Sequence, residues 1–153
     1  MMFKLVVFLV LLVAAALSGF SQPKVNVDGQ LRLGMEQYER MLSAHPDTSK
    51  FPQSVLADGS IRDMPSDWWC SGFFGATLWN LYLYSKDPKW RAAAHKWTMA
   101  VEKEQYNTTT HDLGFMVFYP FGNGYKQTAD ESYKKILLQG AASLATRFDP
   151  ARG

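Results

Sequence analysis

The sequence predicts an all-α protein built from helical hairpins. Apolar residues recur at helical spacing in four segments, and short and long connections alternate between these segments. The alternation of apolar and polar residues that is typical of strands is absent throughout, so no sheet is predicted. Of the 153 residues, 14% are aromatic. Aromatic rings can fill the contacts between packed helices or stack on the apolar faces of sugar rings, and composition alone does not choose between these uses.

The first predicted helix runs from about Gln30 to Ala44, and the second runs from Trp69 to Ser85. The first helix has one apolar face and ends before Pro46. The second helix follows a turn and capping signal at residues 65–67 and is apolar on nearly every side, so we expect it at the centre of the fold. The apolar face of the first helix consists of Leu31, Met35, Tyr38, Met41 and Leu42.

A third helix is predicted to begin at Pro88, because Asp87 can cap its free N–H groups and proline suits the first helical position. The short link before it predicts that the second and third helices are antiparallel neighbours. The fourth helix is expected from about Ala129 to Arg147. The inner faces of these two helices are predicted at Trp90, Ala93, Ala94, Trp97 and Val101, and at Tyr133, Ile136, Leu137, Gly140, Ala141 and Leu144.

Two long connections, residues 45–67 and 106–127, are expected to hold the functional residues. Connections of this length in a compact domain are usually functional or disordered, and the aromatic content of these two argues against disorder. Within the second connection, Gly122-Asn123-Gly124 is interpreted as a tight turn. Trp79, Trp90 and Trp97 are predicted to pack the hairpins rather than to bind a ligand, because they recur at helical spacing.

Residues 1–21 have the three-part pattern of a secretory signal peptide. Lys4 supplies the positive charge, Leu5 to Leu17 form an apolar run, and Ser18 and Ser21 are small residues suited to a cleavage site. The run is shorter than the roughly 20 residues that span a bilayer, although an uncleaved anchor is the alternative. We therefore expect a secreted or periplasmic mature chain, residues 22–153, with no membrane association after signal cleavage.

Composition argues against several function classes. The net charge is +2 with both signs interspersed, so no basic stripe indicates a nucleic-acid partner. The single cysteine, Cys70, cannot form an internal disulfide and is interpreted as a small buried residue. Together with His45, His95 and His111 it shows no metal-ligand spacing, so neither a metal nor another cofactor is predicted.

The most informative segment is His111-Asp112-Leu113-Gly114-Phe115-Met116. It places an imidazole and a carboxylate side by side among aromatic and apolar residues. Desolvation among apolar groups raises the proton affinity of a carboxylate, which prepares it for proton transfer. We therefore interpret the segment as part of an active site. The alternatives are that Asp112 caps a helix and that His111 only hydrogen-bonds a backbone carbonyl.

Three motifs occur in the order and with the spacing of a known family. They are Asp67-Trp68-Trp69-Cys70-Ser71-Gly72-Phe73-Phe74 followed by Thr77-Leu78-Trp79, then Thr110-His111-Asp112-Leu113-Gly114-Phe115-Met116, and Phe121-Gly122-Asn123-Gly124-Tyr125. With these motifs, residues 30–153 resemble glycoside hydrolase family 88, the unsaturated glucuronyl hydrolases. The resemblance implies a partial (α/α)6 toroid, in which residues 22–153 form the N-terminal part of the catalytic domain, about its first two helical hairpins.

The resemblance also implies a substrate and a reaction. The substrates are unsaturated uronic-acid oligosaccharides left by polysaccharide lyases, and the reaction is hydration of their C4=C5 bond by a pair of carboxyl groups. By motif match, Asp112 is the first catalytic carboxylate and also binds the substrate, His111 lines the same subsite, and Trp69 rather than Trp68 contacts the unsaturated sugar. Adjacent tryptophans are not expected to face one cavity together, so one of them is expected in the core.

The family's proton donor lies further along the family's sequence than this chain reaches. The resemblance therefore implies a truncated chain whose helices expose apolar faces. Two alternatives stay open: an inactive remnant with at most weak carbohydrate binding, and an unsaturated rhamnogalacturonyl hydrolase. The sequence does not decide the source polysaccharide, its sulfation or the oligomeric state.

Overall fold

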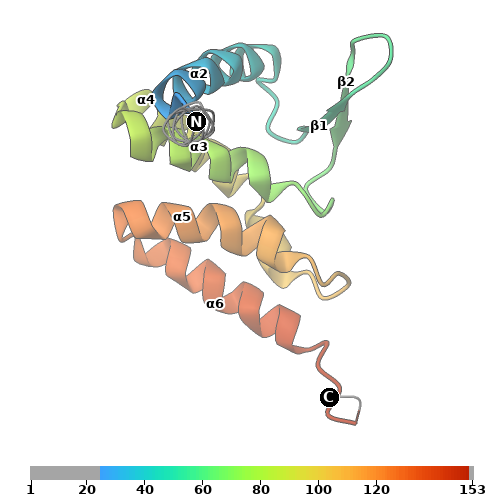
Figure 1. The fold of residues 1–153 in the computed structure, drawn as a ribbon. Helices are drawn as coiled ribbons and strands as arrows, with labels where there is room; N and C mark the ends of the chain where they lie inside the picture. Colours follow the sequence, from blue (N-terminus) through green and yellow to red (C-terminus); the bar gives the residue numbers. More distant parts are fainter. Residues whose placement is uncertain (1–24, 152–153) are drawn as a thin grey trace, which may run out of the picture. The chain divides into compact units, whose positions relative to one another are not determined.

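Helices dominate residues 25–151, the part of the chain that the structure, a computed structural model, describes (Figure 1). The elements in chain order are α2 (Val27–Ala44), β1 (Phe51–Val55), β2 (Ile61–Met64), α3 (Gly72–Ser85), α4 (Pro88–Met99), the 3-10 helix η1 (Glu102–Tyr106), the π-helix η2 (Gly114–Phe118), α5 (Tyr119–Thr128) and α6 (Glu131–Ala145). The chain divides into two units, residues 1–32 and 33–153. The predicted signal peptide lies outside the described residues. Within those residues, no helix combines the length and the apolar character needed to cross a bilayer.

Helix α2 begins earlier than predicted because a side chain caps it. The Oδ1 atom of Asn26 accepts a hydrogen bond from the backbone N–H of Gly29 at 2.9 Å, which satisfies one of the free donors at a helix start. In the second unit, Tyr38 of α2 stacks on Phe74 of α3 with ring centroids 5.3 Å apart. The predicted apolar face of this helix is therefore confirmed where it meets the core.

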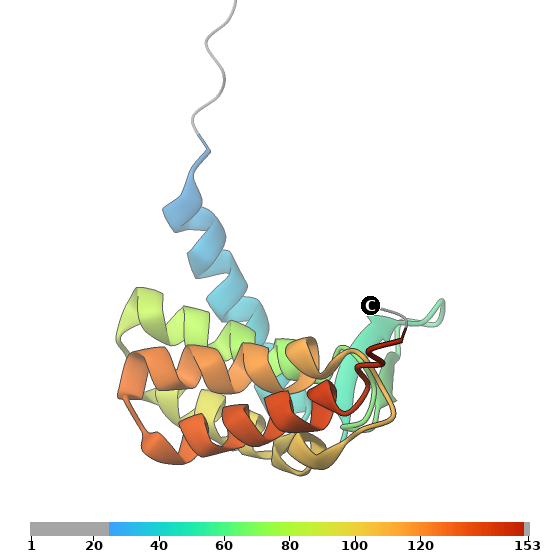
Figure 2. The same ribbon diagram turned by 90° about the horizontal axis from the view of Figure 1, so that it is seen from below.

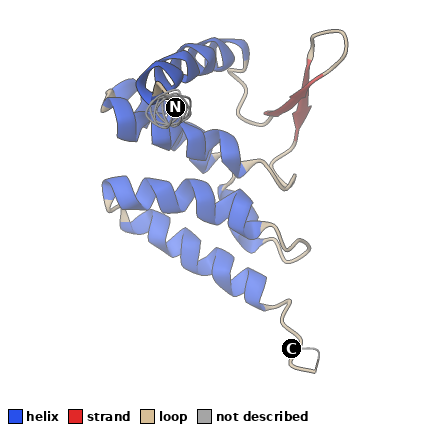
Figure 3. Cartoon of the chain, in the orientation of Figure 1, coloured by secondary structure: helices blue, strands red, loops and turns tan. Residues whose placement is uncertain are grey.

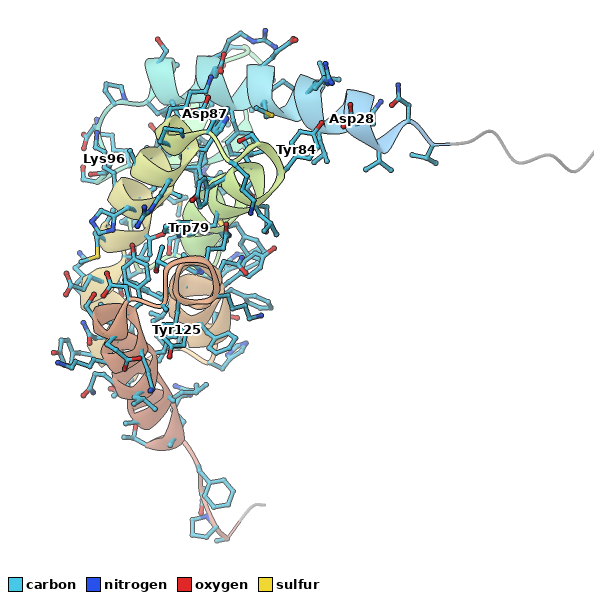
Figure 4. The ribbon with its side chains drawn as sticks, turned by 90° about the vertical axis from the view of Figure 1, so that its left-hand side faces the viewer. Asp28, Trp79, Tyr84, Asp87, Lys96 and Tyr125 are labelled. Carbon is cyan, nitrogen blue, oxygen red and sulfur yellow. The ribbon has the colours of Figure 1, made fainter. Side chains whose placement is uncertain are left out.

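Helix α3 lies at the centre of the second unit, as its apolar sequence predicts, and packs against α4 and α5. The rings of Trp79 on α3 and of Trp90 and Trp97 on α4 are each 1% exposed, which confirms that they pack the hairpins. Trp79 is labelled in Figure 4. Its indole Nε1–H donates a hydrogen bond to Thr98 Oγ1 at 2.9 Å inside this core. Because the large rings fill the space between helices, the core positions both hairpins relative to each other.

The hairpins α3–α4 and α5–α6 turn in the same way. Lys86 and Ala129 follow the first helix of each hairpin with a left-handed backbone, at φ of 58° and 54°. The next residue in each case is an aspartate, Asp87 or Asp130, whose carboxylate accepts a backbone N–H of the following helix at 2.9 Å. The predicted cap and start of α4 are thus confirmed. Helix α6 begins after Asp130, later than predicted, because the left-handed residue ends α5.

A short antiparallel hairpin, β1–β2, corrects the prediction that the chain contains no strands (Figure 3). Phe51 lies opposite Met64, and the register is irregular in the middle of β1. Gly59 turns the chain with φ of +84°, a conformation that glycine adopts without strain. Alternation of apolar and polar residues did not reveal these strands, because neither strand buries one whole face. Phe51 is the single fully buried residue in the two strands. The pair Asp58-Gly59 is the available sequence signal for this hairpin.

Most of the second long connection is helical, which corrects the prediction of a loop over residues 106–127. Helices η2 and α5 occupy residues 114–128, so Gly122 and Gly124 lie inside α5 and not in a tight turn. A Cβ at Gly124 would lie 2.4 Å from the ring of Tyr133 and 3.0 Å from that of Trp79. This glycine therefore serves close helix packing, a use that local turn signals do not distinguish from a turn.

Candidate active site

Two segments that the sequence links to function lie at the same end of the second unit, opposite the short turns of the hairpins (Figure 1, Figure 2). We call residues 66–71 the tryptophan segment and residues 107–112 the aspartate segment. The tryptophan segment leads into α3, and the aspartate segment leads into η2 and α5. Both helices therefore begin at this end, and helix N-termini carry a partial positive charge that favours acidic groups.

Gly72 allows the two segments to approach closely. A Cβ at this position would lie 2.1 Å from the carbonyl oxygen of Phe115 and 2.6 Å from that of Met116. Both oxygens belong to the backbone of η2, which cannot rotate away as a side chain can. The start of α3 therefore lies directly against the helix that follows Asp112.

The π-helix η2 connects Asp112 to α5. The carbonyl oxygen of Asp112 accepts hydrogen bonds from the backbone N–H groups of Phe115 and Met116, at 2.9 and 3.1 Å. Pro120 has no N–H to donate, and in a regular α-helix its ring would clash with the carbonyl of Met116. The wider turn of a π-helix relieves that clash. Asp112 is thus held at the first turn of a helix with an unusual geometry.

Neighbouring side chains orient the carboxylate of Asp112. Its Oδ2 atom accepts a hydrogen bond from Thr110 Oγ1 at 3.0 Å, and the same hydroxyl oxygen accepts the backbone N–H of Asp112 at 3.1 Å. Its Oδ1 atom lies 3.4 Å from His111 Nε2. These are not the contacts of a helix cap, the alternative interpretation of this residue. The side chain is 21% exposed, so a ligand can reach an oriented carboxylate.

His111 lies at the surface beside this carboxylate. Its side chain is 82% exposed, and the ring partner of Asp112 is its Nε2 atom. A ring protonated at Nε2 can donate to the carboxylate, and the exposed ring can also meet a ligand that binds there. Sequence and structure therefore agree in bringing His111 and Asp112 together.

Four aromatic rings form a cluster beside the start of η2, which we call the aromatic platform. It consists of Trp69, Phe73, Phe115 and Tyr119. The ring of Trp69 contacts Phe73 and Phe115 edge-on, with centroids 6.1 and 6.2 Å apart. Trp69 is 43% exposed and Phe115 is 48% exposed. Phe115 lies three residues after Asp112, so these partly exposed rings provide an apolar surface near the candidate residue against which a sugar ring can stack.

Phe73, Phe115 and Tyr119 are site residues that sequence reasoning missed. The first two occur in the motifs quoted for the family resemblance. Phe73 follows Trp69 at helical spacing, four residues on, but no such spacing connects Phe115 with Trp69. Phe73 stacks on Phe115 with ring centroids 5.5 Å apart, and it contacts Tyr119 at 5.3 Å. Only the packing of α3 against η2 brings these rings together.

The prediction that one of the two adjacent tryptophans lies in the core is wrong. Trp68 is 38% exposed and Trp69 is 43% exposed. Residues 66–71 form turns and bends, and α3 begins only at Gly72. Because neither tryptophan lies on a helix, no helical face buries either ring.

Cys70 lacks the lowered pKa that activates a cysteine as a nucleophile. Its side chain is partly buried, and burial raises the pKa of the Cys70 thiol. The thiol therefore stays protonated at neutral pH, and a protonated thiol is a poor nucleophile. Within residues 25–151, no group of three or more His, Cys, Asp or Glu side chains is arranged to hold a metal ion.

A separate cavity of about 610 Å³ lies at the opposite end, by the short turns; its lining includes Trp79, Arg91, His95, Asp130 and Tyr133. Three of its polar side chains already have hydrogen-bond partners. The Tyr133 hydroxyl hydrogen-bonds His95 Nδ1, and Asp130 caps α6. Burial raises the pKa of Tyr133 to about 12, so its hydroxyl stays protonated. These groups hold α4 and α6 together, and the Asp112 end is the better candidate site.

Comparison with known proteins identifies homologues of the chain. No family model matches the chain. An unsaturated glucuronyl hydrolase of Formosa agariphila is 31% identical over 137 residues, which cover 84% of this chain and 34% of that protein. The solved structure of an unsaturated glucuronyl hydrolase specific for heparin is 40% identical, covers 74% of this chain and 30% of that chain, and matches with a TM-score of 0.71. This chain is homologous to the unsaturated glucuronyl hydrolases of glycoside hydrolase family 88.

The homology confirms the family resemblance and the fold that it implies. A solved structure of a single-site variant of the unsaturated glucuronyl hydrolase of Streptococcus agalactiae, complexed with dGlcA-GalNAc6S, has the same fold, with a TM-score of 0.70 at 22% identity. The match covers 82% of this chain and 34% of that chain. The hairpins α3–α4 and α5–α6 are part of a six-hairpin glycosidase fold, the (α/α)6 toroid. The chain spans about a third of the length of these hydrolases.

Proposed function

We propose that this chain carries part of the substrate site and one catalytic carboxylate of an unsaturated glucuronyl hydrolase. Its substrates are lyase-generated oligosaccharides that end in an unsaturated uronic acid, in polysaccharide breakdown. The observation that carries the proposal is the partly exposed carboxylate of Asp112 next to the aromatic platform, in a chain 31% identical to a named hydrolase. The names of the relatives favour glucuronyl over rhamnogalacturonyl substrates.

The proposed reaction is hydration of the C4=C5 double bond rather than attack at the anomeric carbon. A carboxylic acid transfers its proton to C4, and the oxygen of a water molecule bonds to C5 while its proton passes to a carboxylate. The hemiketal formed at C5 opens to a ketone. The hemiacetal left at C1 then releases the adjoining sugar as an alcohol and becomes an aldehyde. The positive charge that develops between C5 and O5 is what a nearby carboxylate stabilises.

Each site residue has a role in this proposal. Asp112 is the first of the two carboxyl groups and stabilises the charge at C5 and O5, oriented by the hydroxyl of Thr110. His111 lines the same subsite, where its exposed ring can donate to the substrate. Trp69 stacks on the unsaturated sugar through the face that the aromatic platform leaves exposed. The second carboxyl group belongs to a later segment of the family's sequence than the one this chain matches.

Carbohydrate binding without turnover is the second candidate function. The partly exposed rings of Trp69 and Phe115 favour it, because a sugar ring can stack on them without any proton transfer.

We also propose that the chain is exported and that residues 1–21 are removed. The support is the charged, apolar and small-residue pattern at the N-terminus. Edman sequencing of the protein recovered from the medium or the periplasm should begin at residue 22. Retention of the protein in the cytoplasm with Met1 intact would contradict this proposal.

The experiment that tests the function uses an unsaturated glucuronyl disaccharide. Turnover is followed as loss of the ultraviolet absorbance of the double bond, and binding is followed by tryptophan fluorescence. Asp112→Asn is expected to lower turnover by at least about 100-fold, the usual effect of removing a proton-transfer or charge-stabilising group. Asp58→Asn in the β1–β2 turn is the matched control. Trp69→Ala should weaken binding, and Trp68→Ala should leave it nearly unchanged.

The outcomes separate the two candidates. Turnover that falls with Asp112→Asn but not with Asp58→Asn supports the hydrolase. Binding that depends on Trp69 without any turnover supports the binding function. If the chain neither binds nor turns over the disaccharide, both proposals are wrong.

A further inference from the structure

Glu104 is a buried carboxylate that no motif singles out. It lies on η1 and is 5% exposed, the charged member of the buried polar residues within the range 25–151. A carboxylate removed from water is costly unless its oxygens accept hydrogen bonds. The partners that satisfy Glu104 therefore show what this residue holds in place.

One oxygen of Glu104 holds the tryptophan segment. Its Oε1 atom accepts a hydrogen bond from Ser66 Oγ at 2.6 Å. The backbone carbonyl of Ser66 in turn accepts a hydrogen bond from Ser71 Oγ at 2.6 Å. Both serines are buried. The two ends of the segment that carries Trp69 are thus tied together and to η1.

The other oxygen of Glu104 holds the aspartate segment. Its Oε2 atom accepts a hydrogen bond from Asn107 Nδ2 at 3.1 Å. Asn107 Oδ1 accepts the backbone N–H and the hydroxyl of Thr109, at 2.9 and 2.8 Å. The next residue, Thr110, donates to the carboxylate of Asp112 at 3.0 Å. A continuous path of hydrogen bonds and one peptide unit therefore leads from Glu104 to Asp112.

Helix η1 is itself anchored to α6. The buried hydroxyl of Ser143 donates to the carbonyl oxygen of Gln105 at 2.6 Å. The aspartate segment has a separate contact beyond the end of α6, where Arg147 Nη1 donates to the carbonyl oxygen of Thr108 at 3.3 Å. The ammonium group of Lys103 lies 3.9 Å from Glu104 on an exposed side chain and contributes little in water. Glu104 thus projects from a fixed helix to two segments that have no regular structure.

We propose that Glu104 is a positioning residue that fixes the aromatic platform and the carboxylate of Asp112 relative to each other. Each of its two oxygens holds one segment, so a single carboxylate keeps Ser66 of the tryptophan segment close to Asn107 of the aspartate segment. The proposal rests on the proposed function for the meaning of these segments, but its test does not need activity. A group that only stabilised the fold would not affect these two segments selectively.

The test is amide hydrogen exchange in the full chain, resolved by segment. Glu104→Leu removes both acceptors and should speed exchange at least about tenfold in both the tryptophan and the aspartate segments. Glu104→Gln should restore most of the protection, because its amide oxygen can accept from Asn107 and its NH2 group can donate to the hydroxyl of Ser66. Glu102→Leu, in the same short helix, is the matched control and should leave both segments protected.

Two further variants address one segment each and keep the carboxylate. Ser66→Ala should speed exchange only in the tryptophan segment, and Asn107→Ala only in the aspartate segment. The proposal is overturned if Glu104→Leu leaves both segments unchanged, or speeds exchange equally throughout α3 to α6. It is also overturned if both segments exchange without protection in the unsubstituted chain. A chain that lacks hydrolase activity but shows the selective pattern would refute the proposed function and leave the role of Glu104 standing.

Discussion

Replacing Gly72 by alanine tests how the two halves of the site are joined. The added Cβ would lie 2.1 Å from the carbonyl oxygen of Phe115, and real Cβ atoms essentially never approach another atom closer than 3.0 Å. The distance must grow from 2.1 to at least 3.0 Å, a shift of about 0.9 Å. Since both partners are backbone, α3 and η2 must move apart as whole elements.

The size of the effect follows from where this shift must occur. Met116 and Val117 on η2 are 0% and 1% exposed, so the packed core resists the movement. Overpacking a core typically costs about 1–3 kcal/mol, and an overlap between backbone atoms belongs at the upper end. Alanine regains at most about 1 kcal/mol through its helix propensity. We therefore expect Gly72→Ala to lower the free energy of unfolding by about 2 kcal/mol or more. Displacement of Asp112 by such a shift would also lower any turnover by about 100-fold.

Urea unfolding followed by circular dichroism measures the first quantity, and the disaccharide assay measures the second. Gly114→Ala is the matched control, because nothing lies within 4 Å of a Cβ at Gly114. This control should be neutral or stabilising by up to about 1 kcal/mol. If Gly72→Ala is as stable as the unsubstituted chain within about 0.5 kcal/mol, the close approach of α3 to η2 is refuted. Equal damage from Gly114→Ala would refute the assignment of the effect to that contact.

Three further predictions concern stability. The pKa of Tyr133 is raised from 10.0 to about 12, so its stabilisation is complete below pH 10 and is lost as the pH rises towards 12; urea unfolding should show a fall of about 2–3 kcal/mol. Tyr133→Phe should remove this fall, and parallel curves for the two proteins would contradict the assignment. Thr98→Val should cost about 1–3 kcal/mol, because the indole N–H of Trp79 loses the acceptor that now lies at 2.9 Å; unchanged thermal unfolding would contradict it. Ala129→Gly should raise stability by up to about 1 kcal/mol, because φ of 54° strains alanine, and a lower melting temperature would count against this explanation.

Much of the helical fold is predictable because its signals are local. Helix α4 begins where Asp87 and Pro88 predict, and its ring-bearing face at Trp90 and Trp97 is buried. These positions are set by capping and by helical spacing, both of which act within a few residues. Helix α5 escaped prediction because Gly124 serves contact with Tyr133 and Trp79, partners distant in the sequence. A glycine required by packing and a glycine required by a turn have the same local sequence.

In the candidate site, too, residues close in the sequence could be predicted, and residues joined only by packing could not. His111 and Asp112 are neighbours in the sequence, so their juxtaposition could be predicted, and the motifs around them are enough to indicate the family. The aromatic platform could not be predicted, because Trp69 and Phe115 meet only where α3 lies against η2. The role of Glu104 also needed the structure, since its two oxygens bind segments on either side of it in the chain.

By itself, the sequence determined the helical class, the start of α4 set by its aspartate cap, the resemblance to the family and the residue pair of the candidate site. Those features depend on short-range spacing and on residue types in fixed order. The tertiary structure alone decided that both adjacent tryptophans stay exposed, that a π-helix follows Asp112, and that one buried carboxylate joins the two segments of the site. The π-helix follows from a local clash at Pro120, which its sequence position alone does not reveal. The contacts of the buried carboxylate join residues far apart in the chain, and they form only when the helices pack together and exclude water.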